Sequence, residues 1–273
     1  MRSCLFLFGV LLAAFASVAQ SAEPTVLLWS SGFESDWQKH WHVTKRKWGQ
    51  ANLQVVKEER GQFPVFLRAS YPAGSASPTV TKATNAPVGG GQFYADLGIE
   101  PRDRMHLRYY VRFAKDFNFV KGGKLPGLFG GTVGTGGQIP DGKNGFTTRL
   151  MWRKNGAGEV YAYTPNSVEH GTSLGRGRWR FIPGRWHLIE QKLVLNEPGK
   201  SNGSILLWID EKEVLNQESL TFRTVSTLQI QGILFSTFYG GDDSTWATPN
   251  DTYADFAAFA VSEQYIGAVA RGK

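Results

Sequence analysis

Short runs of alternating apolar and polar residues, each ended by Gly, Pro, Asn or Asp, recur along most of the chain. In the run His-Leu-Arg-Tyr-Tyr-Val-Arg-Phe, apolar or aromatic side chains occupy every second position: Leu107, Tyr109, Val111 and Phe113. This period of two is typical of a strand with one buried face. No segment keeps a helical period over three turns, and no internal repeat or change of composition marks a second domain. The pattern predicts one all-β domain, an antiparallel β-sandwich of the jelly-roll type with a concave sheet that forms a groove.

The first 22 residues have the organisation of a secretory signal peptide. Arg2 gives a positive start, residues 5–16 form an apolar run, and small residues follow up to Ala22. The apolar run is too short to span a bilayer, which needs roughly 18 continuous apolar residues, and no later run approaches that length. We therefore expect residues 1–22 to be removed, and residues 23–273 to form a secreted or periplasmic domain that does not interact with membranes.

The cysteine content and the net charge limit how the fold can be stabilised and which kind of partner it can bind. The only cysteine, Cys4, lies in the predicted signal peptide, so a mature chain of about 250 residues would depend on its core and not on disulfides. The formal net charge is +7, and it becomes +6 without Arg2. A basic exported protein favours an anionic partner, which could be nucleic acid, lipid or acidic polysaccharide, although a charge of this size can also serve solubility alone.

The segment Thr-Thr-Arg-Leu-Met-Trp-Arg-Lys-Asn-Gly-Ala-Gly-Glu-Val-Tyr-Ala-Tyr predicts a β-hairpin with its turn at residues 155–158. Thr147 and Arg149 are two residues apart on the first strand, and Tyr161 and Tyr163 are two apart on the second. Each pair therefore faces one side of its strand.

The register of this hairpin decides whether the two pairs meet. If Lys154 pairs with Gly158, Arg149 lies opposite Tyr163, and all four polar side chains share one face. A connection one residue longer would place the pairs on opposite faces. We expect the first arrangement.

The segment before the hairpin, residues 117–131, combines dense glycine with Lys121 and Lys124. Glycine at this density disfavours helices and strand interiors, while the flanking aromatic residues indicate packing, so we expect a rigid bend. Its residue order does not match the phosphate-binding pattern G-x-x-x-x-G-K-[ST]. We expect the bend to bring a lysine amine to the face of the hairpin that carries the polar side chains.

An arginine, two tyrosines, a threonine and a lysine suit β-elimination on a uronic acid. Arg149 would pair with the C6 carboxylate and stabilise the negative charge that develops as the C5 proton leaves. Either Tyr161 or Tyr163 would take this proton and donate one to the departing O4, with a pKa lowered by the neighbouring cations. Taken singly, a Tyr-x-Tyr pair is ordinary strand composition and a strand arginine is usually solvated; the combination favours the chemistry.

Other activities lack the residues that they need. A glycosidase requires two carboxylates, and only Glu159 lies near the tyrosines in the sequence. No G-x-S-x-G or H-E-x-x-H motif occurs, and the five histidines are scattered, so no metal or other cofactor is expected. The main alternative is a non-catalytic, lectin-like carbohydrate-binding jelly roll. It would share the fold, groove and charge, but would have no need of two tyrosines beside an arginine and a lysine.

These motifs resemble polysaccharide lyase family 14, the alginate and glucuronan lyases. The resemblance is carried by Tyr-Tyr-Val-Arg-Phe, by the glycine-rich segment and by the hairpin, and it extends over about residues 107–261. It implies a β-jelly roll that cleaves β-1,4-linked polyuronates, generally without a metal, and leaves an unsaturated sugar at the new end. The implied partner is the polysaccharide, not nucleic acid, and we expect a monomer.

The resemblance also assigns roles to individual residues. It places the catalytic lysine on Lys124, with Lys121 as the alternative, and matches a Ser-x-Arg pair to Thr147 and Arg149. Threonine here keeps the hydroxyl group but adds a methyl group. The family's Tyr-x-Tyr pair corresponds to Tyr161 and Tyr163.

Three further residues are expected at the substrate groove. Tyr239 and Trp246 are the first and last residues of the segment Tyr-Gly-Gly-Asp-Asp-Ser-Thr-Trp, which we expect at the rim of the groove. There, either ring could stack on a sugar or simply pack against the protein. Arg112 is expected to line the groove, with exposure to solvent as the competing explanation.

Overall fold

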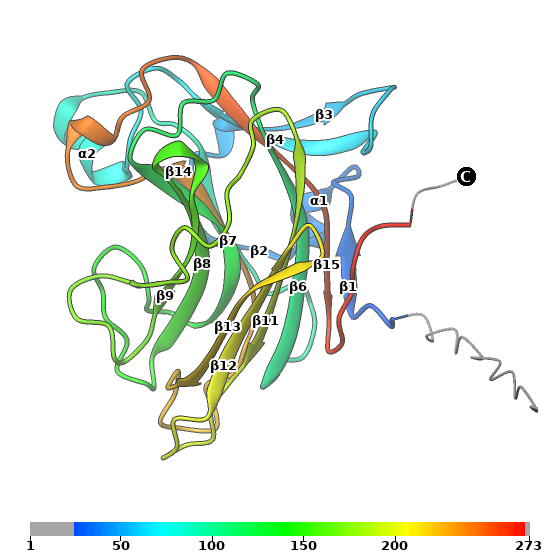
Figure 1. The fold of residues 1–273 in the computed structure, drawn as a ribbon, viewed down its shortest axis with the longest axis vertical. Helices are drawn as coiled ribbons and strands as arrows, with labels where there is room; N and C mark the ends of the chain where they lie inside the picture. The colour runs from blue at the N-terminus through cyan, green and yellow to red at the C-terminus, as the bar shows by residue number, and fades with distance from the viewer. Residues whose placement is uncertain (1–24, 271–273) are drawn as a thin grey trace, which may run out of the picture.

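Residues 25–270, which the computed structural model describes, form two antiparallel sheets (Figure 1). Sheet A is 8-stranded, in the order β13-β12-β11-β6-β15-β4-β3, with β1 paired to β15. Sheet B is 7-stranded, in the order β10-β9-β8-β7-β14-β5-β2. This arrangement confirms the predicted all-β sandwich of the jelly-roll type. The predicted signal peptide lies outside the described residues, and within them no helix has the length and apolar character to cross a membrane.

The elements have the following bounds. Sheet A contains β1 (Trp29–Ser31), β3 (Leu53–Lys57), β4 (Val65–Tyr71), β6 (Arg104–Phe113), β11 (Trp186–Val194), β12 (Gly203–Ile209), β13 (Lys212–Leu220) and β15 (Thr252–Ser262). Sheet B contains β2 (Val43–Trp48), β5 (Gly91–Ala95), β7 (Gly122–Gly131), β8 (Gly145–Arg153), β9 (Gly158–Tyr163), β10 (Thr172–Leu174) and β14 (Gly232–Tyr239). The short helices are α1 (Trp37–His40), α2 (Pro78–Thr84), η1 (Gln50–Asn52), η2 (Lys154–Gly156) and η3 (Ser244–Trp246).

Strand β6 shows how the alternating pattern builds the core. Its four predicted inward side chains are fully buried in the main core cluster: Leu107, Tyr109, Val111 and Phe113. The other face is covered as well. Arg108 donates a hydrogen bond to the carbonyl of Gly267, and the backbone N–H of Val269 donates to the hydroxyl of Tyr110. The C-terminal segment therefore covers a face that alternation alone predicts to be solvated.

The glycine-rich segment is a strand and not the predicted bend. It forms β7, between β8 and β14 in sheet B. Its glycines are required by close neighbours: a Cβ on Gly123 would lie 2.0 Å from the Trp152 ring, and one on Gly127 would lie 2.2 Å from the Thr148 carbonyl oxygen. The register shifts around Pro126, which has no N–H to give to the ladder. Glycine here lets β7 pack closely against its neighbours in the sheet, whereas the high glycine content of the sequence predicted a bend.

The β8–β9 hairpin forms with a register different from the predicted one. Arg149 lies opposite Tyr161 and Thr147 opposite Tyr163, whereas the prediction placed Arg149 opposite Tyr163. The difference arises because η2 makes the connection directly after Arg153, one residue earlier than expected. The resulting offset is an even number of residues, so the four polar side chains still share one face, as predicted.

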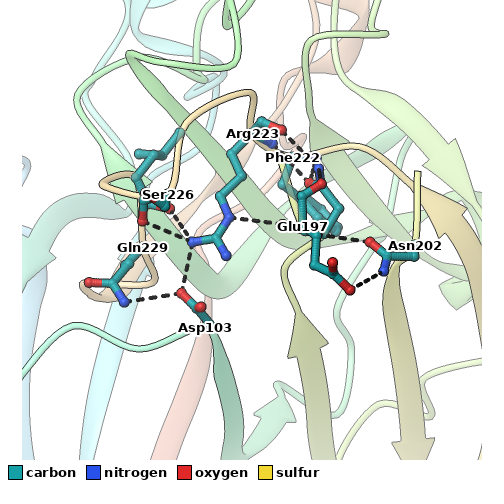
Figure 2. A network of polar contacts seen from close by, with 9 residues as sticks. Asp103, Glu197, Asn202, Phe222, Arg223, Ser226 and Gln229 are labelled. Carbon is teal, nitrogen blue, oxygen red and sulfur yellow. Dashed lines mark hydrogen bonds and ion pairs between the residues drawn. The ribbon is translucent and has the colours of Figure 1, made fainter. Parts of the chain in front are cut away.

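A buried polar network fixes the long connection from β13 in sheet A to β14 in sheet B (Figure 2). Arg223 donates to Asp103 Oδ1 at 2.7 Å and to backbone carbonyls of its own loop. Asn196 Oδ1 accepts from the backbone N–H groups of Phe222 and Arg223. The network holds the chain where it crosses between the sheets, just before β14 contributes to the cavity described next.

Candidate active site

A cavity of about 620 Å³ opens on the face of sheet B that is turned away from the core. Its floor runs across the strands, from Trp48 on β2 to Tyr161 and Tyr163 on β9. The start of α2 and η3 contribute to its wall. Their loops are joined by hydrogen bonds between the backbone N–H of Gly74 and the carbonyl of Thr248, and between the N–H of Thr248 and a carbonyl before α2.

Arg149 is a buried cation in this cavity, with 2% of its surface exposed. Its Nη1 donates to Ser236 Oγ at 3.1 Å, and that hydroxyl donates to Gln92 Oε1 at 2.9 Å. Burial lowers the pKa of Arg149, but a guanidinium remains charged in proteins. Among residues 25–270 no carboxylate forms an ion pair with it, and its Nε has no hydrogen-bond partner. A buried charge without a counter-ion is costly, and an incoming anion would offset that cost.

Lys124 provides a second basic group without a carboxylate partner in the described chain. Its Nζ donates to Met151 Sδ at 2.9 Å and lies 4.0 Å from the centroid of the Tyr161 ring. Burial, followed by the charges of Arg149 and Arg153, lowers the pKa of Lys124 well below its ordinary value. A guanidinium and an amine whose charged form burial disfavours therefore face one cavity, and a bound carboxylate would favour the charged form of the amine.

The one buried carboxylate beside these groups belongs to a different ion pair. Glu159 is fully buried, and its Oε1 lies 2.6 Å from Nη2 of Arg153. Its Oε2 is 3.5 Å from Nε of Arg176. Glu159 thus neutralises arginines at the end of the hairpin, and the region described holds no group of three His, Cys, Asp or Glu side chains arranged for a metal ion.

The two tyrosines pack edge to face, with ring centroids 5.6 Å apart. Tyr163 accepts a hydrogen bond from the backbone N–H of Gly137 at 3.2 Å, which ties it to the loop after β7. Burial raises the pKa of Tyr161 to about 12; Tyr163 adds to this rise, and Arg153 and Arg149 oppose it more weakly. The predicted lowering of the pKa by nearby cations is therefore wrong for Tyr161, because burial outweighs them.

Two further residues predicted at the site, Thr147 and Lys121, do not line the cavity. Thr147 is buried on the same face, but its hydroxyl donates to the carbonyl of Gly134 at 2.6 Å, so it holds the loop after β7 and does not line the cavity. Lys121 lies outside the cavity lining, where its Nζ donates to Thr245 Oγ1. Of the two candidate lysines, the structure places Lys124 beside the tyrosines.

Arg112 does not line the cavity. It lies on β6 in sheet A, where Nη2 is 2.9 Å from Asp255 Oδ2 and 3.4 Å from Glu58 Oε2. The predicted groove position is wrong because an alternating pattern shows which residues share a face, but not which sheet or which side of the sandwich that face belongs to.

The two aromatic residues predicted at the rim have different positions. Tyr239 is 1% exposed, lies in the core, and donates from its hydroxyl to the carbonyl of Asn118 at 2.7 Å, so the predicted rim position is wrong. Trp246, on η3, lines the cavity and is partly exposed. It is therefore available to contact a sugar.

Sequence reasoning missed several residues that line the cavity or, like Ser236, contact Arg149. Met151 shares the face of Arg149 because it is two residues further along β8, and that spacing was an available signal. Ser236, Gln92 and Trp48 come from strands far away in the sequence, and only the pairing of β14, β5 and β2 brings them to the site. No local motif marks them.

A family comparison identifies the chain. The family model described as Polysaccharide lyase 14 matches residues 60–259. The chain belongs to polysaccharide lyase family 14. The predicted resemblance and the predicted enzyme class are confirmed, because members of this family are polysaccharide lyases. The lectin-like alternative loses its support.

Solved structures agree with this assignment. The marine family 14 alginate lyase from Aplysia kurodai is 31% identical with a TM-score of 0.74, over 86% of this chain and 98% of that one. Alginate lyase vAL-1 from Chlorella virus is 21% identical, with a TM-score of 0.70 over 83% and 94% of the two chains. The endo-β-1,4-glucuronan lyase from the fungus Trichoderma reesei is 11% identical, with a TM-score of 0.58 over 88% and 96%. The last two show a shared fold. A search of curated proteins finds no match.

Proposed function

We propose that this lyase cleaves β-1,4-linked polyuronates, either mannuronate-rich alginate or glucuronan, by β-elimination. The observation that carries the proposal is the buried Arg149 guanidinium, which has no carboxylate partner in the described chain and lies in one cavity with Lys124. Such a pair suits the carboxylate that every unit of a polyuronate carries. The similar structures include alginate lyases and a glucuronan lyase, and one alginate lyase structure holds an alginate tetrasaccharide. The signal-like N-terminus supports action outside the cell or in the periplasm.

In the proposed reaction, Arg149 and Lys124 bind the C6 carboxylate of the unit whose linkage is cut. This draws charge away from C5 and stabilises the carbanion-like state that develops when its proton leaves. The phenolate of Tyr161 takes the C5 proton, and the C4–O4 bond breaks as the C4=C5 double bond forms. The same phenol then donates its proton to O4, which regenerates the phenolate and balances the reaction.

One tyrosine can serve both steps on these substrates. In β-linked mannuronate and glucuronate, the C5 hydrogen and O4 lie on the same face of the ring. Tyr161 fits this role better than Tyr163, since Lys124 lies directly over its ring, whereas the hydroxyl of Tyr163 is bound by the N–H of Gly137. Because its pKa is raised, Tyr161 is mostly protonated at neutral pH, and the proton-abstracting form grows as the pH rises.

The test is incubation with polymannuronate, polyguluronate, glucuronan and a neutral β-1,4-glucan, from neutral to alkaline pH. We expect ultraviolet absorbance from a new conjugated double bond with polymannuronate or glucuronan, and no reaction with the neutral glucan. Mass spectrometry should show unsaturated ends. Absence of unsaturated products from every polyuronate would refute the proposed substrate class.

A further inference from the structure

We propose that Arg46 forms a second carboxylate-binding subsite, which holds a uronate unit of the same chain at the β2 end of the cavity. The inference rests on the proposed polyuronate substrate and extends it from one sugar to several. It assigns a function to a residue in β2 that no motif of the sequence marks.

Arg46 is held in a fixed orientation. Its guanidinium carbon lies 3.5 Å from the centroid of the Tyr94 ring and 5.9 Å from that of Phe129. Its Nη1 donates to the carbonyl of Thr132 at 3.0 Å. A guanidinium stacked at this distance is anchored by the aromatic face, while its remaining N–H groups are free to bind a planar carboxylate.

The charge of Arg46 is available for an external partner. Arg46 is exposed, and among residues 25–270 no carboxylate lies within ion-pair distance of it. Asp96, which follows Tyr94 on the same side of the chain, contacts His42 instead, with 3.5 Å between Oδ1 and Nδ1. The platform under Arg46 therefore supports a cation with no counter-ion in the described chain.

Arg46 lies next to the cavity, at the end formed by β2. Trp48, two residues further along β2, lines the cavity beside Gln92, with which it is paired. Arg46 lies over Tyr94, two residues beyond Gln92 on β5, so it is about 7 Å along the strands from the cavity lining. It thus lies next to the end of the cavity that is formed by β2.

Distance from the reacting groups indicates which sugar Arg46 would reach. Three strands, β5, β14 and β7, lie between β2 and the strand that carries Arg149. The side chains shorten this separation, because Arg149 reaches Ser236 on β14 and Arg46 lies over Tyr94 on β5, the strand next to β14. The two guanidiniums are therefore roughly 10 Å apart, about two strand spacings, which is longer than one sugar unit. A polyuronate lying across the strands, with one carboxylate on Arg149, would therefore place the carboxylate of a more distant unit at Arg46. An oligosaccharide that has no further unit on the β2 side of the one bound at Arg149 would not extend that far.

The experiment compares Arg46→Ala with Arg60→Ala as the matched control. Arg60 is also exposed and also has no ion pair in the described chain, but it lies beside β4 of the other sheet, so both variants lose the same charge. We expect R46A to raise the KM for polymannuronate or glucuronan about three- to tenfold, with kcat within about twofold. The rise in KM should become smaller as the oligosaccharide is shortened from the polymer toward a trisaccharide. R46A should also weaken the salt dependence of the polymer KM, and Arg46→Lys should restore part of the loss.

The possible outcomes separate this proposal from the proposed function. If the wild type releases unsaturated products and R46A behaves like R60A on the polymer, the subsite is refuted and the function stands. A loss of kcat that is equal on polymer and trisaccharide also refutes it, because that pattern indicates damage at the reacting groups. If the wild type cleaves no polyuronate, both proposals fall together.

Discussion

Lys124 lies over the face of Tyr161, with Nζ 4.0 Å from the ring centroid. The two side chains come from β7 and β9, the strands on either side of β8, and Lys124 is further held by the sulfur of Met151 on β8. Burial acts on both groups, lowering the pKa of the lysine and raising that of the tyrosine. The cavity thus moves the proton affinities of the amine and the phenol apart, so that the phenol holds its proton more firmly than the amine does, beside a guanidinium that has no carboxylate partner in the described chain.

The two lysines of the glycine-rich strand should behave differently. Lys124→Ala removes a cation from the proposed carboxylate site and should lower kcat/KM about 10²- to 10³-fold. Lys121→Ala should stay within about twofold, because Lys121 donates to Thr245 outside the cavity. Steady-state kinetics on the best polyuronate measures both. Equal losses in the two variants would contradict the assignment of Lys124.

Substitution of each tyrosine by phenylalanine separates the two phenols. Tyr161→Phe removes the proposed proton-transfer group and should lower kcat about 10²- to 10⁴-fold while the polymer still binds. Tyr163→Phe breaks only the hydrogen bond from Gly137 and should have a smaller effect, about tenfold at most. Activity and equilibrium binding should be measured on the same preparations. If Tyr163→Phe caused the larger loss of kcat, the proton transfer would belong to Tyr163.

Ser236 is expected to act by positioning Arg149. Its hydroxyl links the guanidinium to Gln92, so Ser236→Ala should lower kcat/KM roughly tenfold, as the loss of a charged hydrogen bond predicts. Ser236→Thr keeps a hydroxyl group and should recover much of that loss. A Ser236→Ala enzyme with wild-type kinetics, or a threonine variant as weak as the alanine one, would show that the contact does not position Arg149.

The period-two pattern was sufficient to predict the sandwich and the shared face of the hairpin. Tyr161, Tyr163, Thr147 and Arg149 lie on the same face because side chains two residues apart do so in any strand. The exact register depended on where the turn begins, and η2 begins one residue earlier than the glycines suggested. The alternating pattern determines which side chains of the hairpin share a face. The geometry of the turn determines which residue lies opposite which.

The errors arose where contacts between distant segments decide the outcome. The glycines of β7 looked unsuitable for a strand until the Trp152 ring and the Thr148 carbonyl were seen against them. Arg112 looked suitable for a groove, but Asp255 on β15 binds it in the other sheet. Ser236 became part of the site only through the pairing of β14 with its neighbours. None of these contacts leaves a local signal in the sequence.

The pH dependence of kcat and KM should reveal Tyr161 and Lys124, the two groups at the site whose pKa values are shifted by burial. The phenolate form of Tyr161 increases as the pH approaches its raised pKa of about 12, so kcat should increase from neutral to alkaline pH. The pKa of Lys124 is lowered, so its ammonium loses the proton in the same direction, and the KM for an anionic polymer should rise with pH. Lys124→Arg keeps the charge and should flatten the KM profile. A KM that stays constant from neutral to alkaline pH in the wild type would argue against Lys124 as a carboxylate ligand.

The buried charge of Arg149 should lower the free energy of unfolding, because it has no carboxylate partner in the described chain. Arg149→Met removes a buried charge that has no carboxylate partner in the described chain, so we expect lost activity but a melting temperature that is higher by about 2–4 °C, equivalent to roughly 1 kcal/mol. The control is Arg223→Met, at an arginine that is equally buried but bound to Asp103 and several carbonyls. Breaking that network should lower stability by about 3 kcal/mol. Differential scanning calorimetry on both variants measures the contrast. If Arg149→Met lowered the melting temperature as much as Arg223→Met, Arg149 would be part of the structural framework and not an anion site held open for substrate.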